Sequence, residues 1–203
     1  MWRLNLPKNP QRFPNFQAIY PQKALKTTQK RIDKSLLRKA SEIRALIFDV
    51  DGVMTDGKII YSSSGDEIKE FNVRDGIIIS SLKKAGFIVG IISGRESSAV
   101  TRRATELKLD FCHQAIDDKA WACGQIMKHH QLKEKEIAYI GDDINDLPVF
   151  NLAGLKACPA DACTEVLDIA DLVTKAKGGK GVVREVADFL LATNKKSKSG
   201  KEK

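Results

Sequence analysis

The sequence predicts an α/β fold with a parallel sheet covered by helices on both faces. Three apolar runs, 45–48, 87–92 and 137–140, show no alternation of polar and apolar residues. Such runs are expected in strands that are buried on both faces, as parallel strands are. Between them, segments 77–85, 97–107 and 119–130 carry apolar residues at helical spacing. The alternation of buried strands and helices favours a Rossmann-like, doubly wound sheet.

Weaker signals complete the expected domain. Short apolar runs at 155–157 and 171–173 predict further strands, and three glycines at 178–181 predict a loop before a last helix at 182–191. Segments 58–61 and 67–71 are short and β-like, and the turn-forming residues 62–66 connect them. We therefore expect a β-hairpin flap after the first strand. No insertion is long enough for a large cap domain.

Charge divides the chain into three parts. Residues 1–40 contain ten basic residues and one acid, and residues 192–203 contain five lysines and one acid. Because the whole chain carries +8, residues 41–191 are left with a net charge of −5. We expect a flexible basic extension at 1–40, a domain at 41–191 and a flexible Lys-rich tail at 192–203. Basic tails around an acidic domain argue against nucleic-acid binding.

Other bulk features indicate a cytoplasmic protein that does not enter the membrane. No apolar stretch approaches the roughly 18 residues of a membrane span. The four cysteines form no CxxC pair, which favours free thiols in a reducing compartment. The composition of residues 1–40 also fits an organelle transit peptide, a non-targeting extension or a start codon assigned too early.

Polar clusters follow the three strongest apolar runs. Asp49 and Asp51 follow the first run, Ser93-Gly94-Arg95 the second, and Gly141-Asp142-Asp143-Ile144-Asn145-Asp146 the third; Lys119 opens a predicted helix. A single Asp at a strand end is often a turn former or a helix cap. Four such clusters in order are expected to meet at the carboxyl edge of one sheet, where α/β proteins bind ligands.

These residue types suit the hydrolysis of phosphate esters. A phosphate monoester repels a bare carboxylate, and a divalent cation held by carboxylates removes that repulsion. Mg²⁺ prefers a few oxygen ligands, which Asp49 and Asp142 offer. A lysine, a small hydroxyl and loop amides can bind phosphate oxygens, and a second carboxylate can transfer protons.

The order of these motifs resembles the haloacid dehalogenase superfamily of phosphohydrolases, over about residues 43–191. The resemblance implies that Asp49 is the nucleophile and that Asp51 is the general acid/base, with its backbone carbonyl on the metal. It further implies that Ser93, Gly94 and Lys119 bind phosphate. It assigns Mg²⁺ as the cofactor, with Asp49, Asp51 and Asp142 as ligands and Asp143 and Asp146 as supporting carboxylates.

The runs D-V-D-G-V-M-T-D-G, G-D-E-I-K-E-F-N-V-R-D-G and G-G-K-G-V-V-R-E resemble the 3-deoxy-D-manno-octulosonate 8-phosphate phosphatase family. This implies a sugar-acid phosphate as substrate, an aspartyl-phosphate intermediate, and a homotetramer in which the flap and a neighbouring subunit close the site. Extra cations are expected near the substrate carboxylate. The candidates, in decreasing order of support, are Arg95, Arg103, and then Lys69 and Arg74.

Three alternatives stay open at this point. Nonulosonate 9-phosphate phosphatases are similar, although Arg95 favours the octulosonate enzymes. A non-catalytic oligomerisation module of the same fold is another possibility, but such a copy would be expected to lose Asp49, Asp51 or Lys119, and all three are present. The basic tails motivate a third, tail-driven role. In addition, Ile77, Ile78 and Ile79 depart from the family pattern, and we expect them to narrow the pocket or alter subunit packing.

Overall fold

The computed structural model describes residues 34–199, with side chains as far as Asn194. Its centre is a six-stranded sheet in the order β5-β4-β1-β6-β7-β8, in which every neighbouring pair is parallel. The strands are β1 (Ala45–Phe48), β4 (Ile88–Ile92), β5 (Phe111–His113), β6 (Ile137–Ile140), β7 (Leu155–Cys158) and β8 (Leu172–Val173). The doubly wound parallel sheet is therefore confirmed, and its three central strands are the three long apolar runs.

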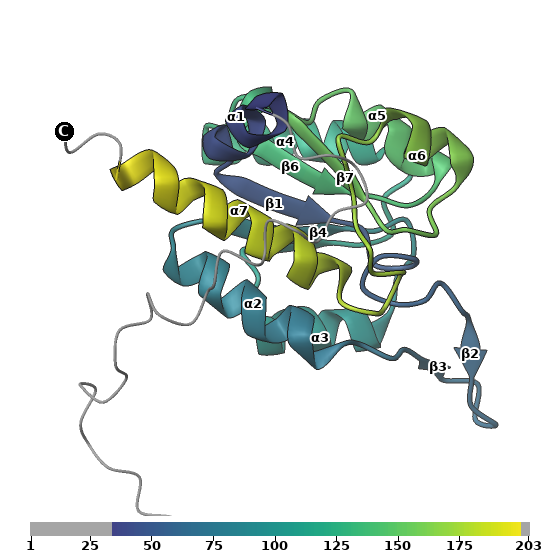
Figure 1. Ribbon diagram of the computed structural model, residues 1–203. Helices are drawn as coiled ribbons and strands as arrows, with labels where there is room; N and C mark the ends of the chain where they lie inside the picture. The colour runs from purple at the N-terminus through teal and green to yellow at the C-terminus, as the bar shows by residue number, and fades with distance from the viewer. Residues whose placement is uncertain (1–33, 200–203) are drawn as a thin grey trace, which may run out of the picture.

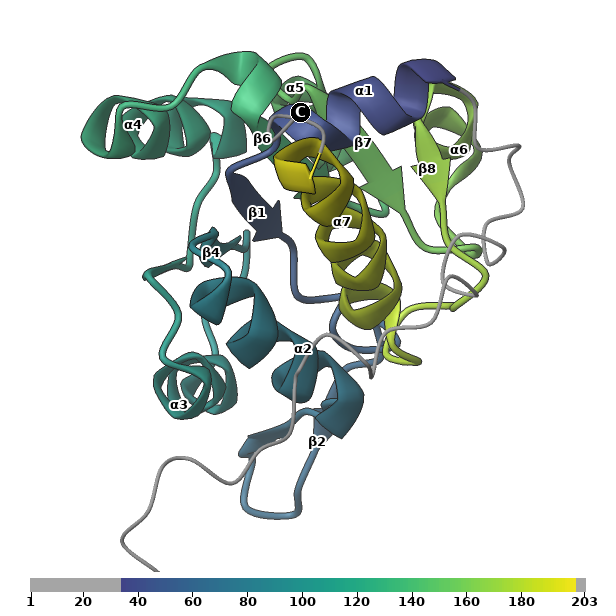
Figure 2. The same ribbon diagram turned by 60° about the vertical axis from the view of Figure 1, so that its left-hand side comes forward.

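Helices cover both faces of the sheet and create two hydrophobic cores. One face packs against α1 (Lys34–Glu42), α2 (Val73–Lys84), α3 (Ser98–Leu107) and α7 (Val182–Ser199), and the other against α4 (Lys119–His130), α5 (Leu147–Phe150) and α6 (Thr164–Ile169). Helices α2 and α7 lie side by side on the first face (Figure 2). Alternate residues of β1 serve the two cores: Leu46 and Phe48 face one, and Ala45 and Ile47 face the other.

Polar side chains fix the starts of the helices that matter for the site. Asn72 caps α2 by accepting a hydrogen bond from the backbone N–H of Arg74, and Asp118 caps α4 in the same way through Trp121. Helix α7 follows Gly181, which has no capping side chain. Instead, Asp75 of α2 accepts the backbone N–H of Arg184 at 2.7 Å. This bond connects the start of α7 to the start of α2.

A two-stranded hairpin, β2 (Ile60–Tyr61) and β3 (Glu67–Ile68), projects from the chain between β1 and α2 (Figure 1). The strands of the main sheet point their carboxyl ends toward the side from which it projects. The segment between β1 and α2 holds only this hairpin, so the expectation of a flap without a large cap domain is confirmed.

The ends of the domain differ from the expected divisions at residues 40 and 191. Helix α1 begins at Lys34, and its Leu36 and Ala40 are buried in the core, so residues 34–40 belong to the folded domain. Helix α7 continues through residues 192–199, and Thr193 is buried. Residues 1–33, most of the predicted extension, lie outside the described residues. Within 34–199, no helix is long and apolar enough to cross a membrane.

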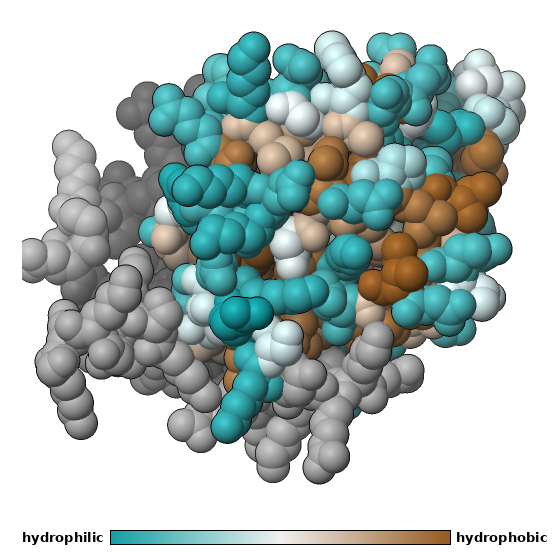
Figure 3. Space-filling view, turned by 90° about the horizontal axis from the view of Figure 1, so that it is seen from above, coloured by the Kyte–Doolittle hydropathy of each residue, from teal (hydrophilic) through white to brown (hydrophobic). Residues whose placement is uncertain are grey.

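The surface seen from above is mostly hydrophilic, which agrees with a chain of which 30% is charged. Hydrophobic side chains gather toward the end of this face formed by α5 and α6 (Figure 3). Ile169, the last residue of α6, is 43% exposed. The exposed apolar residues of the hairpin form a separate group, Ile59, Ile60, Tyr61 and Ile68.

Candidate active site

Asp49 lies directly after β1, where the chain leaves the sheet. Its Oδ1 accepts the backbone N–H of Val50 at 2.6 Å, and its Oδ2 faces Lys119. The loop that follows passes very close to Asp142. Gly52 has a φ of 80°, and a Cβ at this position would lie 1.8 Å from the Asp142 Oδ2. The glycine after the two acids is therefore needed for the first and third clusters to meet.

Lys119 connects Asp49 to Asp146. It opens α4, is buried, and its Nζ donates to Asp49 Oδ2 at 2.6 Å and to Asp146 Oδ1 at 2.7 Å. Burial works to lower the pKa of Lys119, but the charges of Asp49 and Asp146 and the hydrogen bonds to them outweigh burial and raise it. Lys119 therefore remains an ammonium group between two carboxylates.

Asp146 is fully buried and holds the third cluster together. Its Oδ2 accepts the backbone N–H of Asp142 at 2.9 Å and that of Asp143 at 3.4 Å. Its Oδ1 accepts the Tyr139 hydroxyl at 2.7 Å as well as the Lys119 ammonium. The Asp143 side chain is exposed and caps the short turn at Ile144–Asp146. Asp146 is thus the more deeply placed of the two acids, and the supporting role of both toward a metal stays a prediction.

The carboxylates of Asp49, Asp142 and Asp146 offer oxygens that all lie within 4.8 Å of one another. Burial, together with the charges of neighbouring acids, raises the pKa of Asp142 to about 8 and that of Asp49 to about 6. Among the residues described, Lys119 is the one cation that forms ion pairs with this cluster, and its partners are Asp49 and Asp146. The cluster therefore has an excess of negative charge, and its all-oxygen donor set fits a hard divalent cation such as Mg²⁺.

A cavity of about 210 Å³ opens above these acids. Its lining brings the predicted phosphate-binding residues Ser93 and Gly94 next to Asp49, Asp51 and Asp142, and the lining is completed by Gly52, Gly57, Arg95, Asp143 and Asn145. A larger cavity, about 390 Å³, lies around Arg44 and Leu191, but no acid lines it. The smaller cavity is therefore the candidate active site.

Comparisons with known proteins agree with this geometry. The pattern of the haloacid dehalogenase-like hydrolases matches residues 113–186. The chain is 42% identical over 161 residues to the 3-deoxy-D-manno-octulosonate 8-phosphate phosphatase KdsC of Yersinia pestis, covering 79% of this chain and 86% of that protein. The chain belongs to the 3-deoxy-D-manno-octulosonate 8-phosphate phosphatase family.

Solved structures of this phosphatase family carry the same fold. The Moraxella catarrhalis enzyme, in complex with magnesium, phosphate and KDO, superposes with a TM-score of 0.79 at 36% identity, covering 84% of this chain and 98% of that one. The cobalt-bound enzyme of Haemophilus influenzae gives a TM-score of 0.75 at 40% identity, with 78% and 93% covered.

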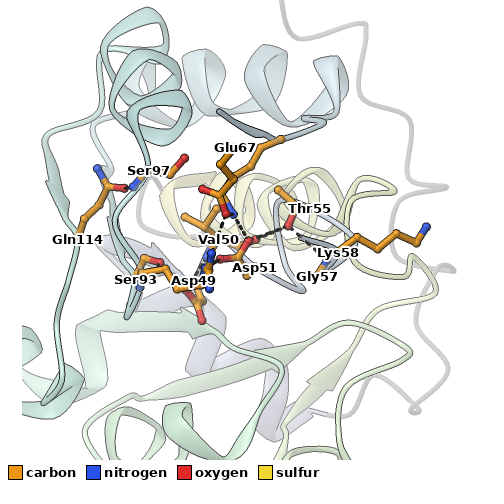
Figure 4. A network of polar contacts seen from close by, with 12 residues as sticks. Asp49, Val50, Asp51, Thr55, Gly57, Lys58, Glu67, Ser93, Ser97 and Gln114 are labelled. Carbon is orange, nitrogen blue, oxygen red and sulfur yellow. Dashed lines mark hydrogen bonds and ion pairs between the residues drawn. The ribbon is translucent and has the colours of Figure 1, made fainter. Parts of the chain in front are cut away.

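In this family member, the hairpin reaches the pocket through charged side chains. Lys69 is 1% exposed, and its Nζ donates to Asp51 Oδ1 at 2.5 Å and lies 3.4 Å from Glu67 Oε1. Arg95 donates to the same Glu67 oxygen at 2.8 Å, and its Nε lies 3.6 Å from Asp51 Oδ2. Figure 4 shows Glu67 and Asp51 pointing toward each other. Two of the predicted substrate cations thus meet Asp51 at the mouth of the pocket.

The structure does not bring Arg103 and Arg74 into this pocket. Arg103 lies over Gly76 of α2, pairs with Glu106 at 3.2 Å and contacts the Phe71 ring. Arg74 is exposed in the first turn of α2 and does not line the pocket. Of the two effects expected of Ile77–Ile79, narrowing of the pocket is not seen, since none of the three lines it, and altered subunit packing stays a prediction. Ile78 and Ile79 are core residues, and Ile77 is exposed on α2.

Three residues that support the site were not predicted from the sequence. Glu67 pairs with Lys69 and Arg95, and Thr55 donates to Asp51 Oδ1 at 3.3 Å. Tyr139 donates to Asp146. Glu67 precedes Lys69 by two residues, so the alternation of a strand places both on one face of the hairpin. Tyr139 is the one side chain with a hydrogen-bonding group in the otherwise apolar run 137–140, which was a usable signal.

Proposed function

We propose that this protein is a magnesium-dependent phosphatase that hydrolyses 3-deoxy-D-manno-octulosonate 8-phosphate. The observation that carries the proposal is the meeting of Asp49, Lys119 and Asp142 at one pocket of a chain in this family. The name of the Yersinia relative and the ligands of the Moraxella structure support this substrate. The nonulosonate alternative has no such support, and a non-catalytic module would not need the complete set of charged residues.

Phosphoryl transfer begins with Asp49. One carboxylate oxygen attacks phosphorus, the bond from phosphorus to the sugar oxygen breaks, and Asp51 protonates that oxygen as it leaves. Asp51 then takes a proton from water as the water oxygen attacks phosphorus, which releases phosphate and restores Asp49. Ser93, the Gly94 loop amide and Lys119 donate to the phosphate oxygens throughout. Each of these groups lines the pocket or contacts Asp49.

Magnesium would be held by Asp49, Asp142 and the backbone carbonyl of Asp51, with Asp143 and Asp146 in support. When bound, it neutralises charge on the phosphate and on the clustered acids. The excess negative charge of the three clustered carboxylates supports this assignment. Asp146 orients the loop that carries Asp142 through the Asp142 N–H.

Arg95 and Lys69 are the proposed contacts for the carboxylate of the sugar acid. Arg95 lines the pocket, Lys69 contacts the lining residue Asp51, and both are paired with Glu67, so binding exchanges one carboxylate partner for another. Arg103 and Arg74 are proposed as substrate-binding cations in a different arrangement, in which they reach the active site of a neighbouring subunit. The nearby exposed apolar residues, Ile59, Ile60, Tyr61, Ile68, Val73 and Ile77, support a homotetramer built on the hairpins.

The remaining proposals concern the setting of the enzyme. We propose a cytoplasmic protein in which the four free cysteines fit a reducing compartment. No nucleic-acid or membrane partner is proposed. Trimming both basic tails is expected to leave phosphatase activity unchanged. Binding of DNA, RNA or anionic vesicles by the full-length chain would contradict this proposal.

A substrate panel tests the function. Phosphate release is measured with eight-carbon and nine-carbon sugar-acid phosphates and glucose 6-phosphate, each with Mg²⁺ and with EDTA. The proposal expects kcat/KM to be highest for the eight-carbon substrate and activity to disappear in EDTA. Preference for glucose 6-phosphate would overturn the substrate but keep the reaction class. No release from any ester would favour the non-catalytic module.

A further inference from the structure

Tyr139 carries a hydroxyl group at a buried strand position where an apolar side chain would be enough for the fold. All four residues of β6 are fully buried, and the other three, Ile137, Ala138 and Ile140, are apolar. A buried hydroxyl costs free energy unless it has a hydrogen-bond partner. Phenylalanine would fill the same space without that cost. The reason for tyrosine therefore lies in what its hydroxyl contacts.

The partner is the carboxylate that holds the catalytic lysine. The Tyr139 hydroxyl donates to Asp146 Oδ1 at 2.7 Å, and the same oxygen accepts the Lys119 Nζ at 2.7 Å. The Tyr139 ring packs edge-on against Phe150, with 6.0 Å between centroids and 79° between planes. Since the ring is enclosed on β6, the direction of the hydroxyl is fixed.

The Tyr139 hydroxyl is a second donor to Asp146, and it changes how strongly Asp146 competes with Asp49 for the Lys119 ammonium group. Lys119 lies 2.6 Å from Asp49 and 2.7 Å from Asp146, so its ammonium is divided between two carboxylates. A donor from Tyr139 satisfies part of the charge on Asp146 Oδ1. Without it, Lys119 would be the single donor to that oxygen among the described residues, and Asp146 would attract the ammonium more strongly, away from Asp49 and the phosphate.

We propose that Tyr139 is a positioning residue that, through Asp146, keeps Lys119 directed at Asp49 and at the phosphate group. The proposal rests on the proposed phosphatase function, because Lys119 is assigned there to the transferred phosphate. Tyr139 itself contacts no substrate. Loss of its hydroxyl is therefore expected to lower kcat and weaken phosphate binding, with no effect on recognition of the sugar.

The test compares Tyr139→Phe with a matched loss of a buried hydroxyl. Thr193→Val serves as the control, because Thr193 is buried in α7 and its hydroxyl donates to Phe189 O at 2.9 Å, away from the pocket. With p-nitrophenyl phosphate and Mg²⁺, we expect Tyr139→Phe to lower kcat about tenfold, the effect of losing one hydrogen bond to a charged group. Titration calorimetry with inorganic phosphate is expected to show binding weakened about fivefold or more. Thr193→Val is expected to leave both unchanged.

A double-mutant cycle with Asp146→Asn separates positioning from a general loss of stability. If Tyr139 acts through Asp146, adding Tyr139→Phe to Asp146→Asn changes kcat or phosphate affinity by less than about twofold. An undiminished tenfold effect in that background would overturn the proposal, as would a Tyr139→Phe enzyme with wild-type kcat and phosphate affinity. If the wild-type protein hydrolyses no phosphate ester, the proposed function fails, and phosphate binding alone decides the role of Tyr139.

Discussion

The buried acid cluster and the projecting hairpin are built in opposite ways. Around Asp49, the charged groups come from the ends of β1 and β6 and from the start of α4, and hydrogen bonds of 2.6–2.9 Å join them. The hairpin has two-residue strands, and its apolar side chains are exposed. It meets the pocket through one set of ion pairs among Asp51, Glu67, Lys69 and Arg95.

This contrast separates the chemistry from the choice of substrate. A cluster held by buried hydrogen bonds can transfer phosphate from any ester that reaches it, because its geometry is fixed before the substrate binds. The hairpin offers few groups, and its Lys69, like Arg95 on the loop after β4, already has a carboxylate partner in Glu67. We therefore expect core substitutions to change kcat for every substrate, and hairpin-side substitutions to change which substrate is preferred.

Asp49→Asn is expected to have the largest effect. A carboxamide keeps the shape and the hydrogen bond to Val50 but is a poor nucleophile, so kcat should fall on the order of 10⁴–10⁶-fold for all substrates. Steady-state phosphate release measures the loss, and the thermal unfolding midpoint checks that the fold is retained. Activity close to wild type would remove Asp49 from the mechanism.

Arg95→Glu tests the substrate side of the comparison. Replacing the cation by an acid at the pocket mouth should lower kcat/KM for the eight-carbon sugar-acid phosphate roughly 100-fold, because a charge-assisted contact becomes a repulsion. The loss for p-nitrophenyl phosphate, which carries no carboxylate, should be smaller, about tenfold, because the new acid still lies near Asp51 and the phosphate. Arg38→Glu, the same charge change on the exposed side of α1, is the control. Equal losses for both substrates would contradict the division between chemistry and selection.

Ile60→Asp tests whether the hairpin is an assembly surface. Ile60 is 43% exposed, and a charge in a buried subunit contact is unfavourable by several kcal/mol. Light scattering should show a tetramer for the wild-type protein and a smaller species for the variant. Ile169→Asp is a matched control, since Ile169 is also 43% exposed but lies on α6. A tetramer unaffected by Ile60→Asp would place the interface elsewhere.

Asp75→Asn is the subtlest change and concerns stability. Burial raises the pKa of Asp75 from 3.8 to about 6. The folded state therefore binds the proton of the Asp75 carboxyl group more tightly than the unfolded state does. The resulting contribution to the free energy of unfolding is complete below pH 3.8 and is lost as the pH rises through about 6. The asparagine side chain of the variant retains an acceptor for the Arg184 N–H but does not titrate. Denaturant unfolding measures the free energy of unfolding at each pH. Relative to the wild type, that of the variant should rise by on the order of 2 kcal/mol between about pH 4 and pH 7.

Asp66→Asn in the exposed hairpin turn is the control for this pH dependence. We expect its unfolding free energy to follow that of the wild type at every pH. An Asp75→Asn protein that follows the wild type equally closely would contradict the assignment of this pH dependence to the core.

The core site was predictable from the sequence, and the hairpin contacts were not. Asp49, Lys119 and Asp142 follow long apolar runs or open a strongly periodic helix, so strand order alone brings them together. Strand β5 and helices α5 and α6 are too short to show a period. The partner of Arg95 depended on the path of the hairpin, which local sequence does not determine. Arg103 lies on α3, eight residues after Arg95, but its guanidinium group packs over Gly76 and does not reach the pocket.

The most direct test of the account is to locate the transferred phosphoryl group. Asp51→Asn should slow hydrolysis of the aspartyl phosphate more than its formation. Acid-quenched protein incubated with substrate and Mg²⁺ is digested with trypsin, which releases residues 45–58 as one peptide, between Arg44 and Lys58. Mass spectrometry should find one added phosphoryl group on this peptide, assigned to Asp49 by fragmentation and absent from Asp49→Asn. Phosphorylation at another residue, or turnover without any phosphorylated peptide, would contradict the account.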